Sequence, residues 1–264
     1  MERLQEALQK ARQKRNENDP GHESISGKPG RPQSADVLWK NLTAFQPDAA
    51  HLERNRIVTG HANKVSASFD ILRTKIMLTM QKNNWKRIAI TSPTVGCGAS
   101  TTACNLALGF GRQPDVRTCL FEFDLRKPSI ADKLGLPDGA DIADMLTGKV
   151  PYADQGLRYK DNVAISAARQ RNADPTAIMV NRDTHQTLEQ IEKTYDPDIT
   201  IFDLPPLLSS DNARAFLKQV DCALMVALAE RSTVTEVDEC EREIAEQCNV
   251  IGVVLNHCRH IDGA

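Results

Sequence analysis

The stretch from Thr91 to Ala103, TSPTVGCGASTTA, decides the fold. It follows an apolar run at 87–92 and leads into a helical pattern at 101–113. A glycine-rich turn between a strand and a helix lets consecutive backbone N–H groups and the helix N-terminus face an anion. GCGAST at 96–101 therefore has the outline of a phosphate-binding loop. Ala99 stands where such a loop carries a lysine.

The chain around this loop alternates between short apolar runs and helical patterns. Runs with the length of buried strands lie at 87–92, 118–123, 162–167, 198–203, 222–229 and 250–256. Helical patterns lie at 67–81, 101–113, 174–194, 211–219 and 233–248. This alternation predicts an α/β fold, with a doubly wound, mostly parallel sheet and helices on both faces. Ligands of such sheets bind beyond the carboxyl ends of the strands.

Residues before the sheet divide into two segments. Residues 1–17 have apolar side chains at helical spacing and predict an N-terminal amphipathic helix. It docks either on its own domain or on a partner, because periodicity does not name the target. Residues 18–60, which begin with a stretch rich in Pro, Gly and Ser, are interpreted as a linker and lead-in, and 61–264 as the P-loop domain.

Composition excludes several classes of function. The formal net charge is −2, so no overall field attracts nucleic acid, and no apolar run approaches the ~20 residues that cross a bilayer. The charged N-terminus is not typical of a secretory signal, which favours a cytoplasmic location. The seven cysteines form no CxxC pair and fit a reducing compartment. His257, Cys258 and His260 match no usual zinc spacing.

Acidic residues stand at the ends of two predicted strands. Glu122 and Asp124 lie in FEFDLRKP, where the second apolar run ends. The two-residue period of a strand predicts that both side chains face the ligand cleft. Asp203 is the last residue of the run at 198–203 and lies in the segment IFDLPPLLSSD. An acid at that position usually holds Mg²⁺. Ser100 occupies the hydroxyl position that would ligate the same ion. Each acid alone could be a helix cap or a solvated strand end, but together with the loop they predict a nucleotide site.

The ordered set of these motifs resembles a known family. TSPTVGCGASTTACNLAL, LFEFDLRKPSI, ITIFDLPPLLSSDNA and VIGVVLN are similar to segments of the bacterial tyrosine kinases of capsule and exopolysaccharide export, which are related to the ParA and MinD ATPases. The resemblance runs from about Ala67 to Asn256, and NADPTAIM at 172–179 loosely resembles a further family segment. The combination is far more specific than any one motif.

The resemblance implies a nucleotide site and a partner. Its loop would be Gly96, Cys97, Gly98, Ala99, Ser100 and Thr101. Glu122, Asp124 and Asp203 would stand in the acidic motifs of the catalytic centre. The cofactors would be ATP and Mg²⁺ if binding is retained, with Ser100, Asp124 and Asp203 around the metal. The implied partner is the cytoplasmic tail of a membrane-bound polysaccharide co-polymerase, which would recruit the protein to the inner membrane. The resemblance is also compatible with a homo-oligomer of this chain.

The departures from the family pattern cluster on functional parts. Ala99 replaces the loop lysine, and Glu122 stands where the family has aspartate. The family's ring-forming helix reads Glu-x-x-Arg-x-x-Arg, and here these positions are Ala67, Asp70 and Arg73. The tail NHCRHIDGA carries no tyrosine for autophosphorylation. The tyrosines of the chain are Tyr152, Tyr159 and Tyr195.

Three hypotheses follow. The first is a regulatory partner in exopolysaccharide synthesis with lost or weakened ATP use. The second is an active tyrosine kinase or ATPase in which Arg126 or Lys127 replaces the missing cation, although the pattern favours surface charges for both residues. The third is a positioning ATPase of the ParA and MinD kind, which usually needs the loop lysine. Retention of the fold alongside four separate losses favours the first.

Overall fold

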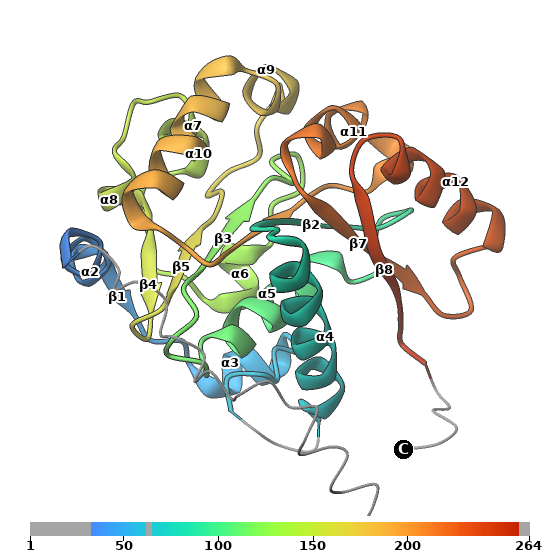
Figure 1. Cartoon of the computed structure of the whole chain (residues 1–264), viewed down its shortest axis with the longest axis horizontal. Coiled ribbons are helices and arrows are strands. Elements are labelled where there is room, and N and C mark those ends of the chain that lie inside the picture. The colour runs from blue at the N-terminus through green and yellow to red at the C-terminus, as the bar shows by residue number, and fades with distance from the viewer. Residues whose placement is uncertain (1–32, 62–64, 259–264) are drawn as a thin grey trace, which may run out of the picture. The chain divides into compact units, whose positions relative to one another are not determined.

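The computed structural model describes residues 33–61 and 65–258 of the chain. The helix predicted at 1–17, residues 18–32 of the linker and the tail from 259 onward lie outside the described residues. The described elements surround one eight-stranded sheet (Figure 1). Its strand order is β1-β4-β5-β3-β6-β2-β7-β8.

Neighbouring strands of the sheet run parallel, except for the antiparallel pair β4 and β5. The strands are β1 (Thr43–Phe45), β2 (Arg87–Thr91), β3 (Thr118–Glu122), β4 (Leu157–Tyr159), β5 (Val163–Ser166), β6 (Ile199–Asp203), β7 (Cys222–Leu228) and β8 (Asn249–Asn256). The mostly parallel sheet is thus confirmed, and all six predicted runs form strands. Sequence analysis missed β1 and β4, because three residues are too few to show a pattern.

Helices cover both faces of the sheet (Figure 1). They are α2 (Gln33–Asn41), α3 (Ala49–Arg54), α4 (Ala67–Asn83), α5 (Ala99–Phe110), α6 (Ile130–Leu134), α7 (Ile142–Leu146), α8 (Tyr152–Gln155), α9 (Pro175–Met179), α10 (Arg182–Tyr195), α11 (Asp211–Phe216) and α12 (Val234–Ala245), with 3₁₀ turns at Leu207–Ser209 and Leu217–Gln219. Helices α3 to α6 pack on one hydrophobic cluster, and α2 with α7 to α12 on the other. Successive strand residues alternate between the clusters: Leu120 joins the first and Phe121 the second. This arrangement is the predicted doubly wound fold.

Part of the predicted lead-in contributes to the sheet. From Gln33 onward, residues assigned by sequence to the linker and lead-in form α2, β1 and α3. β1 pairs with β4 over Thr43–Phe45, and Trp39 of α2 is 1% exposed and donates a hydrogen bond to the Tyr195 carbonyl. Within the described residues, no helix is both long and apolar enough to cross a membrane.

The strand order brings the predicted site together. β2 lies between β6 and β7, and β3 lies beside β6, so the carboxyl ends of β2, β3 and β6 meet at one edge. The glycine-rich turn follows β2 at this edge, and α5 begins directly after it. The acidic residues that sequence analysis placed at strand ends therefore come within reach of the turn.

Candidate phosphate-binding site

The turn between β2 and α5 has the backbone of a phosphate-binding loop. Gly96 and Gly98 have φ of 89° and 96°, in a region that side-chain-bearing residues rarely adopt. Gly98 is also the N-cap residue of α5 and offers no side chain to cap the helix. The first N–H groups of α5 therefore face the cavity without a capping side chain, which suits an anion.

Asn256, the last residue of β8, holds this loop in place. Its side-chain Nδ2 donates a hydrogen bond of 2.9 Å to the Cys97 carbonyl. A Cβ atom on Gly98 would lie only 2.3 Å from the same nitrogen. Gly98 is therefore required both by its φ and by the close approach of Asn256. Sequence analysis did not single out Asn256, and its only signal was its place at the end of a strand.

A pocket of about 450 Å³ opens over the loop. It is lined by the loop residues 96–101 and by Asp124, but not by Glu122 or Asp203. It is also lined by Arg56, Lys127, Lys133, Asn256 and His257. Arg126 does not line it and instead borders a neighbouring cavity of about 360 Å³.

Glu122 does not face the pocket, and the expectation that it does so is wrong. Its carboxylate is fully buried and accepts hydrogen bonds from three backbone N–H groups, those of Ser129, Ile130 (2.8 Å) and Ala168 (2.9 Å). Burial raises the pKa of Glu122 to about 7, against the three N–H donors, which lower it. The physical reason for the difference is that β3 ends at Glu122, so the two-residue alternation does not extend to Asp124.

Asp203 lies beneath the loop at the end of β6 and is 0% exposed. Neither carboxylate oxygen makes a hydrogen bond to a described residue with good geometry. Burial, and then the negative charge of Glu122, raise the pKa of Asp203 well above its usual range, whereas the nearby Ser100 hydroxyl lowers it. A buried carboxylate without a hydrogen-bond donor is costly, so this group is short of a positive partner.

The donor set fits Mg²⁺. Ser100 and Asp124 line the pocket and offer hard oxygen ligands, whereas Asp203 offers two oxygens without a hydrogen-bond partner but is fully buried and does not line the pocket. Among the described residues no three His, Cys, Asp or Glu side chains gather closely enough to hold a metal alone. Mg²⁺ would therefore depend on Ser100, on water and on phosphate oxygens, as it usually does. When bound, the ion would neutralise the negative charge of phosphate groups.

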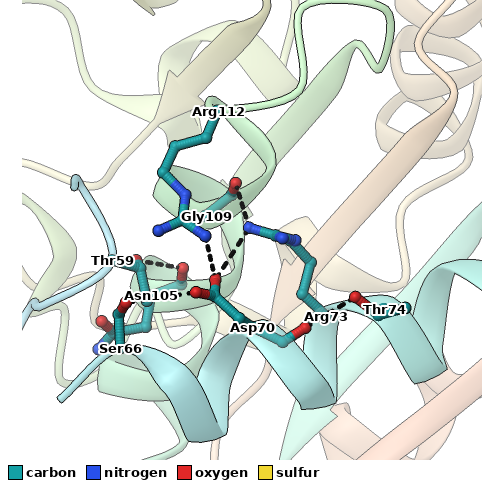
Figure 2. Close-up of polar contacts among 8 residues, drawn as sticks. All are labelled: Thr59, Ser66, Asp70, Arg73, Thr74, Asn105, Gly109 and Arg112. Carbon is teal, nitrogen blue, oxygen red and sulfur yellow. Dashed lines mark hydrogen bonds and ion pairs between the residues drawn. The ribbon is translucent and has the colours of Figure 1, made fainter. Parts of the chain in front are cut away.

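The helix before β2 uses its charged residues inside the subunit. Figure 2 shows Asp70 of α4 between Arg73 and Arg112. Arg73 Nη1 donates to Asp70 at 3.1 Å and to the Gly109 carbonyl of α5 at 2.9 Å. Ser66 Oγ donates to the other Asp70 oxygen at 3.3 Å. Asp70 and Arg73, the residues that the sequence analysis compared with a ring-forming motif, therefore tie α4 to α5.

Comparisons with known proteins agree with the motifs. No family model matches the chain. The chain is 23% identical over 211 residues to the tyrosine-protein kinase YwqD of Bacillus subtilis, covering 78% of this chain and 87% of YwqD. It is 26% identical over 202 residues to the tyrosine-protein kinase CpsD of Streptococcus agalactiae, covering 74% of this chain and 83% of CpsD.

Solved structures share the fold. The chimerical protein CapA2B2 superposes with a TM-score of 0.70 at 21% identity, covering 86% of this chain and 100% of that chain. The cell division ATPase MinD of Pyrococcus furiosus gives a TM-score of 0.56 at 22% identity, covering 67% of this chain and 74% of MinD. The fold and the loop thus define a protein of the MinD and ParA class of P-loop folds. Within that class, the chain is similar in sequence to bacterial tyrosine-protein kinases, the family that its motifs resemble.

Proposed function

We propose that this chain is a regulatory member of the family, with lost or weakened ATP use. The observation that carries the proposal is Ala99. The loop around it keeps the glycine conformations of a phosphate site, yet residue 99 presents a methyl group that is 8% exposed and packs in a hydrophobic cluster. A lysine at this position supplies a charge-assisted contact of about 1.5–3 kcal/mol in the ground state. Its loss should weaken binding and reduce turnover more strongly, because phosphoryl transfer depends on positioning and electrostatic stabilisation.

The tyrosines support the same proposal. Tyr152, Tyr159 and Tyr195 are the only tyrosines of the chain and are 7%, 4% and 5% exposed. A buried phenol cannot reach the active site of another subunit without unfolding its surroundings. Autophosphorylation on tyrosine therefore lacks an accessible acceptor in the folded protein.

The regulatory partner would be the cytoplasmic tail of a membrane-bound polysaccharide co-polymerase. This part of the proposal is supported by relatives named as tyrosine-protein kinases and by the likeness to the chimerical CapA2B2. Such a tail would bring a cytoplasmic protein to the inner membrane without a membrane span of its own. Co-purification of the full chain with a membrane fraction that contains the co-polymerase, and its loss when the tail is removed, would test this part.

ATP use is tested by two measurements on the purified full chain. Calorimetric titration with ATP, with and without Mg²⁺, should show weak binding that Mg²⁺ strengthens. Incubation with γ-³²P-labelled ATP should leave the protein unlabelled. Tight binding together with clear label on tyrosine would overturn the proposal and favour an active kinase. That alternative gains no support from Arg126, because its side chain borders a different cavity.

A further inference from the structure

The phosphate-loop pocket is lined by more cations than anions. Arg56, Lys127 and Lys133 line it together with one carboxylate, that of Asp124. Arg56 is exposed and contacts the His257 ring. Lys127 is also exposed, and its charge acts on Asp124. Lys133 differs from both, since it is half-buried and makes no ion pair within residues 33–61 and 65–258.

The position of Lys133 is set by elements that belong to the site. It lies on α6, which packs against α5, the helix that the loop opens. Its side chain lines the pocket, and its positive charge acts on Asp203 and on Cys104 of α5. The start of α6 is in turn fixed by Glu122, which accepts the N–H groups of Ser129 and Ile130. Glu122 therefore positions the helix that carries Lys133.

Lys133 is half-buried as a residue and lines the pocket beside the loop. Asp203 interacts with its charge, but within the described residues no carboxylate forms an ion pair that would balance it. An anion in the pocket would do so, at the same time as it met the N–H groups of the loop and of α5. The arrangement is thus incomplete in the free protein and complementary to phosphate.

We propose that Lys133 supplies the cation that the loop lacks at Ala99, so that residues 96–101 and Lys133 together bind a polyphosphate chain such as that of a nucleoside triphosphate. In this arrangement the lysine lies on α6, whereas the loop is the turn before α5, so the two come from separate elements. The inference rests on the proposed function only in that the loop still meets phosphate. It does not require turnover.

The test is calorimetric titration of the full chain with Mg·ATP and, separately, with inorganic pyrophosphate. Lys133→Gln should weaken both by about 10- to 150-fold, the equivalent of one charge-assisted contact. Lys133→Arg, which keeps the charge, should stay much closer to the wild type. Lys82→Gln, a matched change at an exposed lysine of α4, should leave both affinities unchanged. Equal affinities for the wild type and Lys133→Gln would overturn the inference.

A second variant separates ligand binding from a merely structural role. Adding Ala99→Lys to Lys133→Gln should restore most of the lost affinity, because the new lysine reaches the same phosphates from the loop. Thermal melting shows whether each variant is folded. If Lys133→Gln does not fold, the comparison of the wild type with Lys133→Arg and with Ala99→Lys still decides: a large gain from Ala99→Lys alone means that no cation was present, and the inference fails.

The outcomes distinguish this inference from the proposed function. A wild type that binds neither probe at millimolar concentration overturns the role of Lys133 and leaves a non-catalytic regulator in place. A wild type that incorporates ³²P on tyrosine, with the label lost in Lys133→Gln, overturns the regulator and supports Lys133.

Discussion

Glu122 and Asp203 are direct neighbours in the register of β3 and β6, yet their carboxylates differ in hydrogen bonding. Glu122 accepts hydrogen bonds from three backbone N–H groups, whereas the oxygens of Asp203 have only the Ser100 hydroxyl nearby and make no hydrogen bond of good geometry within the described residues. One of these two adjacent buried carboxylates therefore fixes the backbone, and the other is left short of a positive partner.

Replacing Glu122 by Gln should destabilise the fold and loosen the start of α6. The new amide group would place a donor against at least one backbone N–H, and an unsatisfied buried group costs about 1–3 kcal/mol. Urea denaturation should show this loss. Pyrophosphate affinity should fall much less than in Lys133→Gln, because Glu122 touches no ligand. If Glu122→Gln were as stable as the wild type, its carboxylate would not be a structural anchor.

Gly98→Ala should cost more stability than Gly96→Ala. Both glycines have positive φ, and strain of this kind costs of order 1–3 kcal/mol. A Cβ on Gly96 meets nothing within 4 Å, whereas one on Gly98 meets Asn256. Adding Asn256→Ala should therefore recover the steric part of the Gly98→Ala loss and none of the Gly96→Ala loss. Urea denaturation of each glycine variant, with and without Asn256→Ala, measures these free energies of unfolding. Equal losses and equal recoveries for the two glycines would contradict the prediction.

Arg73→Met should lower stability and leave the oligomeric state unchanged. It removes a charge-assisted bond to Asp70 and one to the Gly109 carbonyl, each worth about 1.5–3 kcal/mol before relaxation. Arg54→Met, at an exposed arginine of α3, is the matched control. Denaturation and light scattering measure the two properties. A change in mass without a change in stability would show that Arg73 serves an interface between subunits.

Ser100→Ala should remove the Mg²⁺-dependent part of ATP affinity. The hydroxyl is the ligand that the loop itself offers to the ion, and it also lies near Asp203. Titrations with and without Mg²⁺ should therefore converge in this variant. Ser68→Ala, at an exposed position of α4, should keep the wild-type difference. Persistence of the full Mg²⁺ effect in Ser100→Ala would place the ion elsewhere.

The sequence predicts the fold well and the site in part, for a physical reason. Strand and helix patterns are local, so the six longer strands and the glycine loop could be recognised from the residues alone. The places of Lys133 and Asn256 depend on packing between elements far apart in the chain, and no local pattern marks them. Glu122 illustrates the limit of local patterns. The two-residue alternation of side chains does not continue past the end of β3, so it did not predict correctly which way Glu122 faces.

The hydrogen bond from Asn256 to Cys97 joins residues 159 positions apart. During synthesis, the turn at 96–101 leaves the ribosome long before β8 exists. The nascent turn thus has its glycines but lacks the side chain that holds them. The phosphate loop is encoded early, but its contact with Asn256 forms only after the last strand of the sheet has docked, and a chain that ended before residue 256 would lack this contact.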